Sequence, residues 1–193
     1  MPIRPARPAD LPLLQAIERA AGEPFRALGM AEIADDDPPP LTLLQIYTDN
    51  KRGWVATTTT KSEPGLADEN NDDDEGHPVA YLLASTVDGT AHIEQVSVHP
   101  TAARRGLGAA LINHLAAWAA AQRDLSALTL TTFAEVPWNA PYYQRIGFRV
   151  LEAHELGEGL CEIRRLEGER GLDRWPRVCM RRELPVGGVG SVP

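Results

Sequence analysis

The sequence has little cysteine and no long apolar run. Its two cysteines, Cys161 and Cys179, stand far apart in neither a CxxC nor a Cys/His spacing, which predicts two buried thiols in a reducing compartment and no metal site. No segment approaches the length of about 18 apolar residues that a membrane-spanning helix needs, and the opening MPIRPARPADL contains no apolar core of a signal peptide. We therefore expect a cytoplasmic protein with no membrane partner.

The sequence also lacks a basic excess. Its formal net charge is −8, but residues 57–76 hold seven acidic residues against one lysine and carry −6 of that charge. Because the other residues carry only about −2 and form no basic stripe, we expect no nucleic-acid partner. Residues 57–76 have no hydrophobic periodicity and almost no apolar side chains, so the sequence predicts a flexible acidic insertion loop there.

Hydrophobic residues make up 43% of the 193 residues, which is enough for one globular core. We expect one domain over residues 1–185 and a disordered, glycine-rich tail at 186–193. Periodicity and turn signals predict helices at 9–26, 41–52, from 107 onward and at 139–146, with strands at 2–7, 53–59, 77–87, 91–98, 127–133, 148–156 and 177–184.

The order of these elements predicts the fold class. A strand, a helix and a strand follow one another between residues 91 and 133, which makes the two strands parallel. The earlier strands form an antiparallel meander, with a tight Asp-Gly turn at 88–89. We therefore expect an α/β (α+β) domain on a mixed, mostly antiparallel sheet of six or seven strands, flanked by about four helices.

The stretch from residue 96 to 115, VSVHPTAARRGLGAALINHL, joins a β-branched strand to an amphipathic helix through two glycines. Glycines let backbone N–H groups approach a ligand, and the first turn of a helix offers unpaired N–H donors and a positive dipole end. Arg104 and Arg105 add positive charge, so the expected ligand is a phosphate or pyrophosphate. A P-loop is excluded because no Lys-Ser/Thr pair follows, and a GxGxxG motif would need glycine where Leu111 stands. A structural turn without a ligand is the alternative.

This stretch resembles the acetyl-CoA motif of the GNAT N-acetyltransferase superfamily, in which a strand ending in V-x-P precedes [Q/R]-x-x-G-x-[G/A] at the start of a long helix. Residues 139–150, NAPYYQRIGFRV, are similar to the second signature of the family, a helix with a tyrosine four residues before a Gly-Phe pair. The resemblance covers roughly residues 2–184. Two features depart from the family: Ala103 replaces the Gln/Arg of the motif, and the loop at 57–76 is longer than usual.

The resemblance implies acetyl-CoA as the co-substrate. Its pyrophosphate would lie on the N–H groups of the glycine turn, and its pantetheine arm would pair with the end of the strand at 91–98. Asn139 would bond to the same arm. The implied cofactor-binding residues are Val96, Val98, Arg104, Arg105, Gly106, Leu107, Gly108, Ala109 and Asn139.

The resemblance also implies catalytic residues. By match to the family position, Tyr143 is the expected general acid for the leaving thiolate, with a packed aromatic that orders the cofactor as the alternative. Glu94 is the expected base, because it precedes the pantetheine-binding strand end and alternation would place it on the face of Val96 and Val98. A surface or ion-paired glutamate is the alternative. His92 lies next to this position without metal-ligand companions.

We expect Phe25, Phe133 and Trp138 to bind the acceptor substrate, although ordinary packing would account for each of them equally well. The resemblance implies an N-acetyltransferase that moves an acetyl group from acetyl-CoA to a primary amine of a small molecule. The amine would attack directly in a ternary complex, and the protein would act as a monomer or homodimer. A protein or peptide N-acetyltransferase and a non-catalytic acyl-CoA sensor are the alternatives, and the presence of both Glu94 and Tyr143 favours an enzyme.

Overall fold

The computed structural model describes residues 1–58 and 76–184 of the chain. The expected acidic loop at 57–76 lies outside the described residues except at its ends, and the expected tail at 186–193 lies outside them entirely. The chain clusters into two compact units. Unit 1 takes in residues 1–83 and 95–112, and unit 2 takes in residues 84–94 and 113–193.

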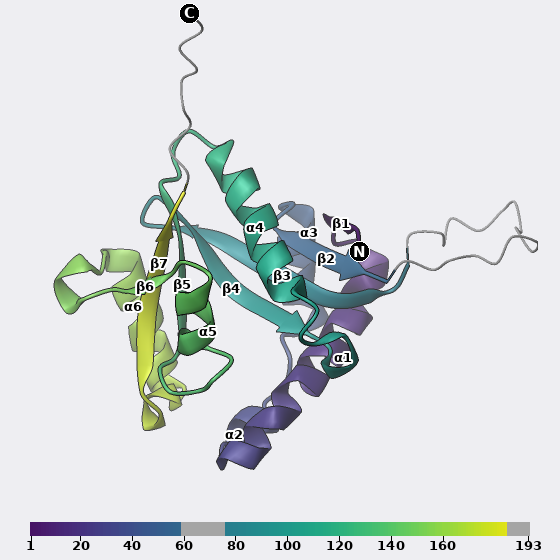
Figure 1. The fold of residues 1–193 in the computed structure, drawn as a ribbon, viewed down its shortest axis with the longest axis horizontal. Coiled ribbons are helices and arrows are strands. Elements are labelled where there is room, and N and C mark those ends of the chain that lie inside the picture. The colour runs from purple at the N-terminus through teal and green to yellow at the C-terminus, as the bar shows by residue number, and fades with distance from the viewer. Residues whose placement is uncertain (59–75, 185–193) are drawn as a thin grey trace, which may run out of the picture. The chain divides into compact units, whose positions relative to one another are not determined.

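Among the described residues, seven strands form one mixed sheet in the order β1-β2-β3-β4-β5-β7-β6 (Figure 1). The strands are β1 (Ile3–Pro5), β2 (Gly53–Thr57), β3 (Pro78–Val87), β4 (Thr90–Val98), β5 (Ala127–Phe133), β6 (Arg149–Val150) and β7 (Arg177–Glu183). β4 and β5 run parallel, and the β1–β2, β2–β3, β5–β7 and β6–β7 pairs are antiparallel. The expected fold class and the parallel pair are therefore confirmed.

The described part of the chain contains six α-helices rather than the four or so that the sequence predicts. They are α1 (Leu11–Gly22), α2 (Ala31–Ala34), α3 (Leu41–Asp49), α4 (Leu107–Ala120), α5 (Ala140–Arg145) and α6 (Glu158–Glu169). The short α2 and the longer α6 are the additional ones. Residues 148–156, expected as a strand, form only the two-residue β6 and a 3-10 turn that leads to α6. None of the helices in the described residues is long and apolar enough to cross a membrane.

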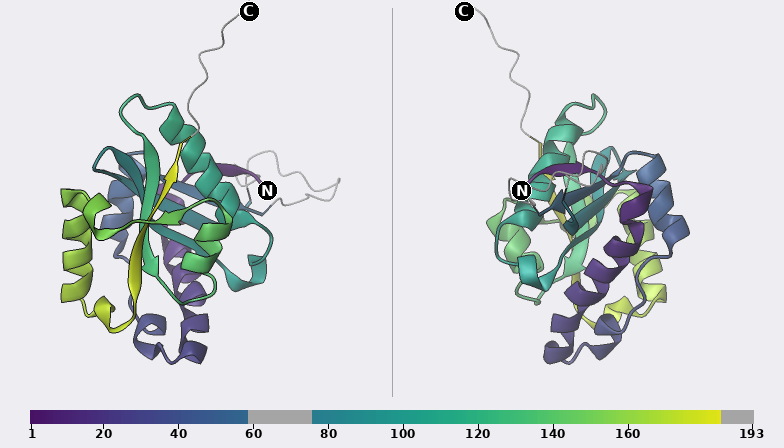
Figure 2. Two further views of the ribbon diagram at one scale, coloured as in Figure 1. Left: turned by 60° about the vertical axis from the view of Figure 1, so that its left-hand side comes forward. Right: turned by 90° about the vertical axis from the view of Figure 1, so that its right-hand side faces the viewer.

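In unit 1, α1 and α3 cover β2 and β3. α1 presents Leu11, Leu14 and Ile17 on one face, as the helical period requires. Figure 2 shows α1 lying beside α3. The buried cluster beneath them consists of Ala6, Leu11, Leu14, Ile17, Leu44, Val55, Tyr81 and Leu83.

In unit 2, the β3–β4 turn anchors α6. Asp88 has a φ of 48° and Gly89 a φ of 68°, which confirms the predicted Asp-Gly turn. The Asp88 carboxylate accepts hydrogen bonds from the backbone N–H groups of Gly159 (2.9 Å) and Leu160 (3.0 Å), and so caps the N-terminal end of α6. Through this cap a turn residue about 70 positions earlier in the chain fixes the start of the helix.

The inner face of α6 packs on β7. Its apolar cluster consists of Val87, Leu151, Leu156, Leu160, Ile163 and Cys179. Cys179 is buried there as a free thiol, and burial raises its pKa. Cys161 is also a free thiol but is exposed, which corrects the expectation that both thiols are buried.

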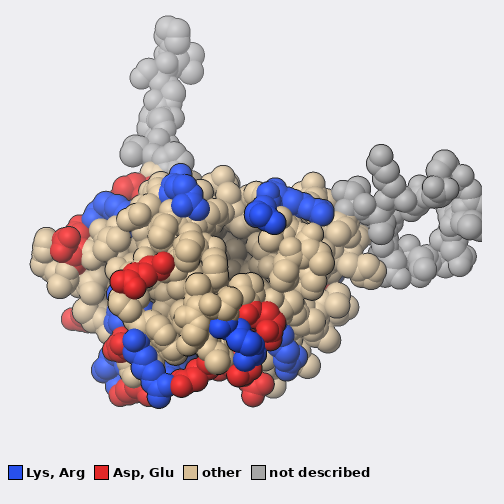
Figure 3. Space-filling view, turned by 60° about the horizontal axis from the view of Figure 1, so that its bottom comes forward, with Lys and Arg blue, Asp and Glu red and all other residues tan. Residues whose placement is uncertain are grey.

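The outer face of α6 carries ion pairs. Arg165 bonds to Glu162 at 2.7 Å and also to Glu169. On the face drawn in Figure 3, acidic and basic side chains lie close together along the lower edge, and neither sign forms a continuous stripe.

Candidate active site

The connection between β4 and α4 contains backbone conformations that favour glycine. A 3-10 turn over Pro100–Ala102 follows the strand. Arg104 then has a φ of 60° and Gly106 a φ of 77°, both in the left-handed region. α4 begins directly after this turn, so its first N–H groups lack helical acceptors and point out of the helix end.

The backbone of this glycine turn is open. A Cβ placed on Gly106 would meet no heavy atom within 4 Å, so the glycine is required by its φ angle and not by crowding. Residues 104–106 are exposed, Leu107 is buried with 6% of its surface exposed, and Gly108 and Ala109 are half-buried. Leu107 thus anchors the helix start while the preceding backbone stays accessible to a ligand.

Glu94 is exposed on β4, and its Oε1 accepts a hydrogen bond of 2.5 Å from Ser85 of β3. Ser85 and Tyr81 are four residues apart on β3 and therefore share a face. Ser97 of β4 hydrogen-bonds to Tyr81. Glu94 and Ser97 consequently face the same side of the sheet, although they are three residues apart.

Strict alternation along β4 therefore does not hold. The Gln95 amide donates to the Ser97 hydroxyl at 2.8 Å, so these two residues share a face and the irregularity lies between Glu94 and Gln95. One extra residue in a strand, a β-bulge, has this effect. Val96 and Val98, both half-buried, point to the other face, which corrects the expectation that they share a face with Glu94.

Asn139 and Tyr143 are joined by the first turn of α5. The Tyr143 N–H donates to the Asn139 carbonyl at 2.9 Å. Asn139 occupies the expected N-cap position, but its side chain makes no capping hydrogen bond. The Tyr143 ring packs edge-on against Tyr142 and Phe148, with ring centroids 5.5 and 5.7 Å apart. Burial raises the pKa of Tyr143, and Tyr142 adds to this, so the phenol keeps its proton at neutral pH.

The three predicted substrate-binding residues differ in exposure. Phe133 is buried, packs edge-on against Trp175 at 6.1 Å and lies under the Arg177 guanidinium at 4.6 Å. Phe25 is half-buried in the 3-10 segment after α1. Trp138 is 40% exposed and offers the most accessible surface of the three.

The predicted site residues divide between the two units. Unit 1 holds Phe25, Val96, Val98 and the glycine turn at 104–109, and unit 2 holds Glu94, Phe133, Trp138, Asn139 and Tyr143.

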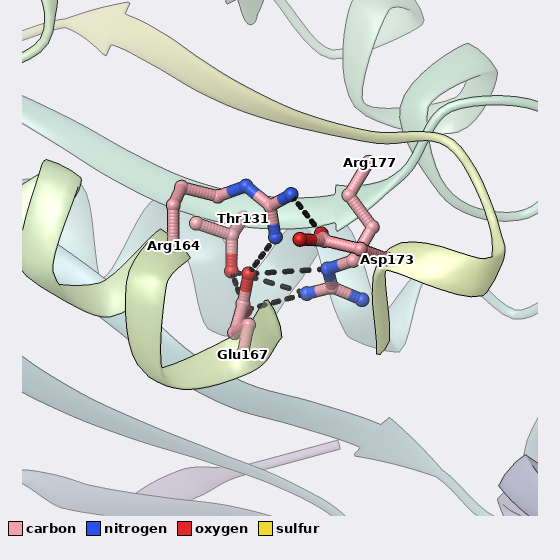
Figure 4. A network of polar contacts seen from close by, with 5 residues as sticks. All are labelled: Thr131, Arg164, Glu167, Asp173 and Arg177. Carbon is pink, nitrogen blue, oxygen red and sulfur yellow. Dashed lines mark hydrogen bonds and ion pairs between the residues drawn. The ribbon is translucent and has the colours of Figure 1, made fainter. Parts of the chain in front are cut away.

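Unit 2 also contains a polar network that the sequence did not point to (Figure 4). The Glu167 carboxylate on α6 accepts hydrogen bonds from Thr131 of β5, from Arg177 of β7 at 2.6 Å and from Arg164 at 2.5 Å. Burial would raise the pKa of Glu167, but Arg177, Thr131 and Arg164 together hold it below its usual value. Arg164 also pairs with Asp173 at 2.5 Å. The only local signal for this network was the spacing of Arg164 and Glu167 on a helix that the sequence analysis missed.

Residues 13–148 match a family model described as the acetyltransferase (GNAT) family. The match covers well over half of the chain. The chain therefore belongs to the GNAT family of acetyltransferases. It is an N-acetyltransferase, as the two sequence motifs predict.

Solved structures share the fold. N-acetylglutamate synthase from Neisseria gonorrhoeae, complexed with coenzyme A and N-acetyl-glutamate, has a TM-score of 0.64 at 17% identity, covering 96% of this chain and 35% of that one. The ribosomal-protein-S18-alanine N-acetyltransferase from Escherichia coli has a TM-score of 0.59 at 18% identity, covering 100% and 99%. Arabidopsis thaliana NAA60 in complex with acetyl-CoA has a TM-score of 0.61 at 16% identity, covering 94% and 98%. The chain thus spans about a third of the first protein and nearly all of the other two.

Proposed function

We propose that this acetyltransferase moves the acetyl group of acetyl-CoA to the primary amine of a small molecule, by direct attack in a ternary complex. The observation that carries the proposal is the open glycine turn before α4 in a chain of the GNAT family. Similar structures were solved with coenzyme A or acetyl-CoA, which supports the choice of co-substrate.

The residues of the turn fit a pyrophosphate. Exposed backbone around Gly106 leads into the first turn of α4, where N–H groups and the helix dipole favour an anion. Arg104 and Arg105 add two exposed positive charges beside it. Ala103 offers no side-chain donor, so we assign the phosphate contacts mainly to the backbone.

Other cofactor contacts follow from the same assignment. The backbone around Val96 and Val98, at the end of β4, would hold the pantetheine arm. The Asn139 side chain makes no capping bond to α5, and we assign it a hydrogen bond to that arm.

Acetyl-CoA supplies an acetyl group activated as a thioester. The protein must remove a proton from the attacking amine and supply one to the leaving thiolate. An aliphatic ammonium has a pKa of about 10, so it must lose a proton before it can attack at neutral pH. The exposed Glu94 carboxylate is our acceptor for that proton. Tyr143 keeps its own proton at neutral pH and is our donor to the leaving thiolate, whose thiol has a pKa of only about 8.5. Holding both substrates together supplies much of the remaining rate enhancement.

A peptide or protein amine is the second candidate acceptor. The similar structures include an enzyme named for the alanine of a ribosomal protein, and NAA60 solved with a bisubstrate analogue. We favour a small amine because the half-buried Phe25 and the exposed Trp138 offer short apolar surfaces for one.

A thiol-release screen tests the proposal. Purified protein with acetyl-CoA would be offered small amines, polyamines, amino acids, aminoglycosides and peptides, and free coenzyme A thiol would be measured over time. We expect release that depends on a small amine and saturates with it. Thiol release only with peptides would show that the acceptor is a peptide and not a small molecule. Tight acetyl-CoA binding without thiol release for any acceptor would indicate an acyl-CoA sensor instead of an enzyme.

A further inference from the structure

One partly buried carboxylate, that of Glu18 on α1, has no positive charge paired with it. Within residues 1–58 and 76–184, the carboxylates that are not exposed belong to Asp10, Glu18 and Glu167. Asp10 pairs with Arg4 at 2.7 Å, and Glu167 pairs with Arg177 at 2.6 Å. No described arginine, lysine or histidine pairs with Glu18. Since withdrawing a carboxylate from water is costly without a counter-charge, Glu18 is the exception among the three.

The pKa values of Glu18 and Glu167 show what the difference in partners does. Both carboxylates accept a hydrogen bond from a hydroxyl group, which belongs to Tyr81 for Glu18 and to Thr131 for Glu167. Burial would raise the pKa of Glu167, but its arginine partners and Thr131 hold it below its usual value. Burial raises the pKa of Glu18 and outweighs the Tyr81 hydrogen bond, and the exposed Asp36 adds to the rise. The environment of Glu18 therefore lacks a cation.

A series of hydrogen bonds points its protons towards Glu18. The Gln95 amide donates to the Ser97 hydroxyl at 2.8 Å, and Ser97 hydrogen-bonds to Tyr81. Burial raises the pKa of Tyr81 well above its usual value, so the phenol keeps its proton and donates it to Glu18. The phenol oxygen is then left to accept from Ser97. Donors that end on a carboxylate stabilise its ionised form.

The same hydrogen bonds place Glu18 close to the strand end that we assign to the pantetheine arm. Ser97 stands between Val96 and Val98 on β4, and all of these residues belong to unit 1 together with α1. Two successive O–H···O bonds span at most about 6 Å, so a Glu18 oxygen lies within that distance of the Ser97 hydroxyl. Glu18 is only half-buried, so a ligand on the α1 side of this strand end can reach it.

We propose that Glu18 binds a second positive charge of the acceptor, which makes the substrate a small amine with another cationic group, such as a diamine or polyamine. The proposal rests on the acetyl transfer proposed above and names the acceptor class for it. The amine that attacks the thioester must be neutral, so Glu18 holds the amine that does not react. An aliphatic amine has a pKa of about 10, so this second group is an ammonium at neutral pH and supplies the missing cation.

A matched pair of acceptors tests the proposal. 1,4-Diaminobutane and 4-aminobutan-1-ol have the same length, but one ends in an ammonium and the other in a neutral hydroxyl. We expect the wild-type protein to favour the diamine in kcat/KM on the order of 10- to 10²-fold, the worth of a hydrogen bond to a charged group. Diamines with three and five carbons, each with its amino alcohol, cover the chain length. Equal kcat/KM within every pair would overturn the proposal.

Glu18→Gln assigns the preference to this side chain. Glutamine keeps the size and an oxygen that accepts from Tyr81, but it has no charge, so most of the preference for the diamine should be lost. Glu32→Gln is the matched control, because it removes the same charge from an exposed position on α2 and should keep the preference. An equal loss in both variants would show a long-range effect of net charge and would overturn a local site at Glu18.

A binding measurement separates this proposal from the proposed function and needs no variant. Wild-type protein saturated with coenzyme A would be titrated calorimetrically with each member of the pair. Tighter binding of the diamine, again on the order of 10- to 10²-fold, is the expected result. If no amine is acetylated, the proposed function fails while this titration still decides whether a cation site exists. If amines are acetylated but the titration shows no preference for the diamine, acetyl transfer stands and the role of Glu18 fails.

Discussion

Replacing Gly106 by valine separates binding from folding. The φ of Gly106 is 77°, a region that a β-branched residue rarely adopts, yet the space around its missing Cβ is open. The cost to the fold is therefore backbone strain alone, about 1–2 kcal/mol. For a chain of this length that corresponds to a melting temperature lower by roughly 2–8 °C, which leaves the protein folded at 25 °C.

The cost to binding should be larger. In our assignment the open backbone at Gly106 is where the pyrophosphate approaches, and a valine side chain would fill that approach. Losing two hydrogen bonds to a charged group removes about 3–6 kcal/mol. At 1.4 kcal/mol for each tenfold change in affinity, this weakens coenzyme A binding by roughly 10²- to 10⁴-fold.

Calorimetric titration with coenzyme A measures this effect, and Gly171→Val supplies the control. Gly171 has a φ of 80° and equally open surroundings but lies before a 3-10 turn near the end of α6. The two variants should lose similar stability, and only Gly106→Val should lose affinity. Equal affinities in both variants would refute the placement of the pyrophosphate on the glycine turn.

Three further predictions concern the acid, the acidic loop and the buried histidine. Tyr143→Phe keeps the ring packing and removes the proton donor. Steady-state kinetics should therefore show kcat lowered on the order of 10²-fold with little change in the KM for acetyl-CoA. Unchanged turnover, with the chemical step shown to be rate-limiting, would refute Tyr143 as the general acid. Replacing residues 59–75 by a two-residue turn should leave the melting temperature and turnover nearly unchanged. The Thr58 N–H already donates to the His77 carbonyl at 3.0 Å, and the entropic cost of closing a loop depends weakly on its length. Lost activity with an intact fold would contradict this prediction. Burial lowers the pKa of His92 on folding, so the contribution of this residue to stability is complete above about pH 6.5 and is lost as the pH falls. The free energy of unfolding should therefore decrease less from pH 7 to 5 in His92→Asn than in the wild-type protein. Parallel curves of unfolding free energy against pH would contradict the lowered pKa.

The elements that the sequence predicts well are those encoded by local patterns. The stripe of α1, the Asp-Gly turn at 88–89 and the strand–glycine–helix order around Gly106 all depend on neighbouring residues, and the structure has each of them. The family motifs depend on the same local patterns, so the residue match and the family model agree.

What the sequence did not predict depends on partners distant along the chain. α6 contains Gly159 and Gly168, which lower its intrinsic propensity, and it is held by the Asp88 cap and by packing on β7. The irregularity after Glu94 is visible only through the hydrogen bonds that Glu94 and Ser97 make with β3 and the one that Gln95 makes with Ser97. The hydrogen bond between His92 and Thr129 likewise depends on the sheet register, which places the two residues opposite each other.

The most direct test of the account is to follow the acceptor itself. Wild-type protein, Gly106→Val and Gly171→Val would each be mixed with acetyl-CoA and the best amine from the screen, at an acetyl-CoA concentration near the wild-type KM. Mass spectrometry would measure acetylated amine against released coenzyme A. We predict one acetylated amine for each thiol released with the wild-type protein and with Gly171→Val, and almost none with Gly106→Val. Thiol release without an acetylated amine, or equal product from all three proteins, would contradict acetyl transfer from a cofactor held on the glycine turn.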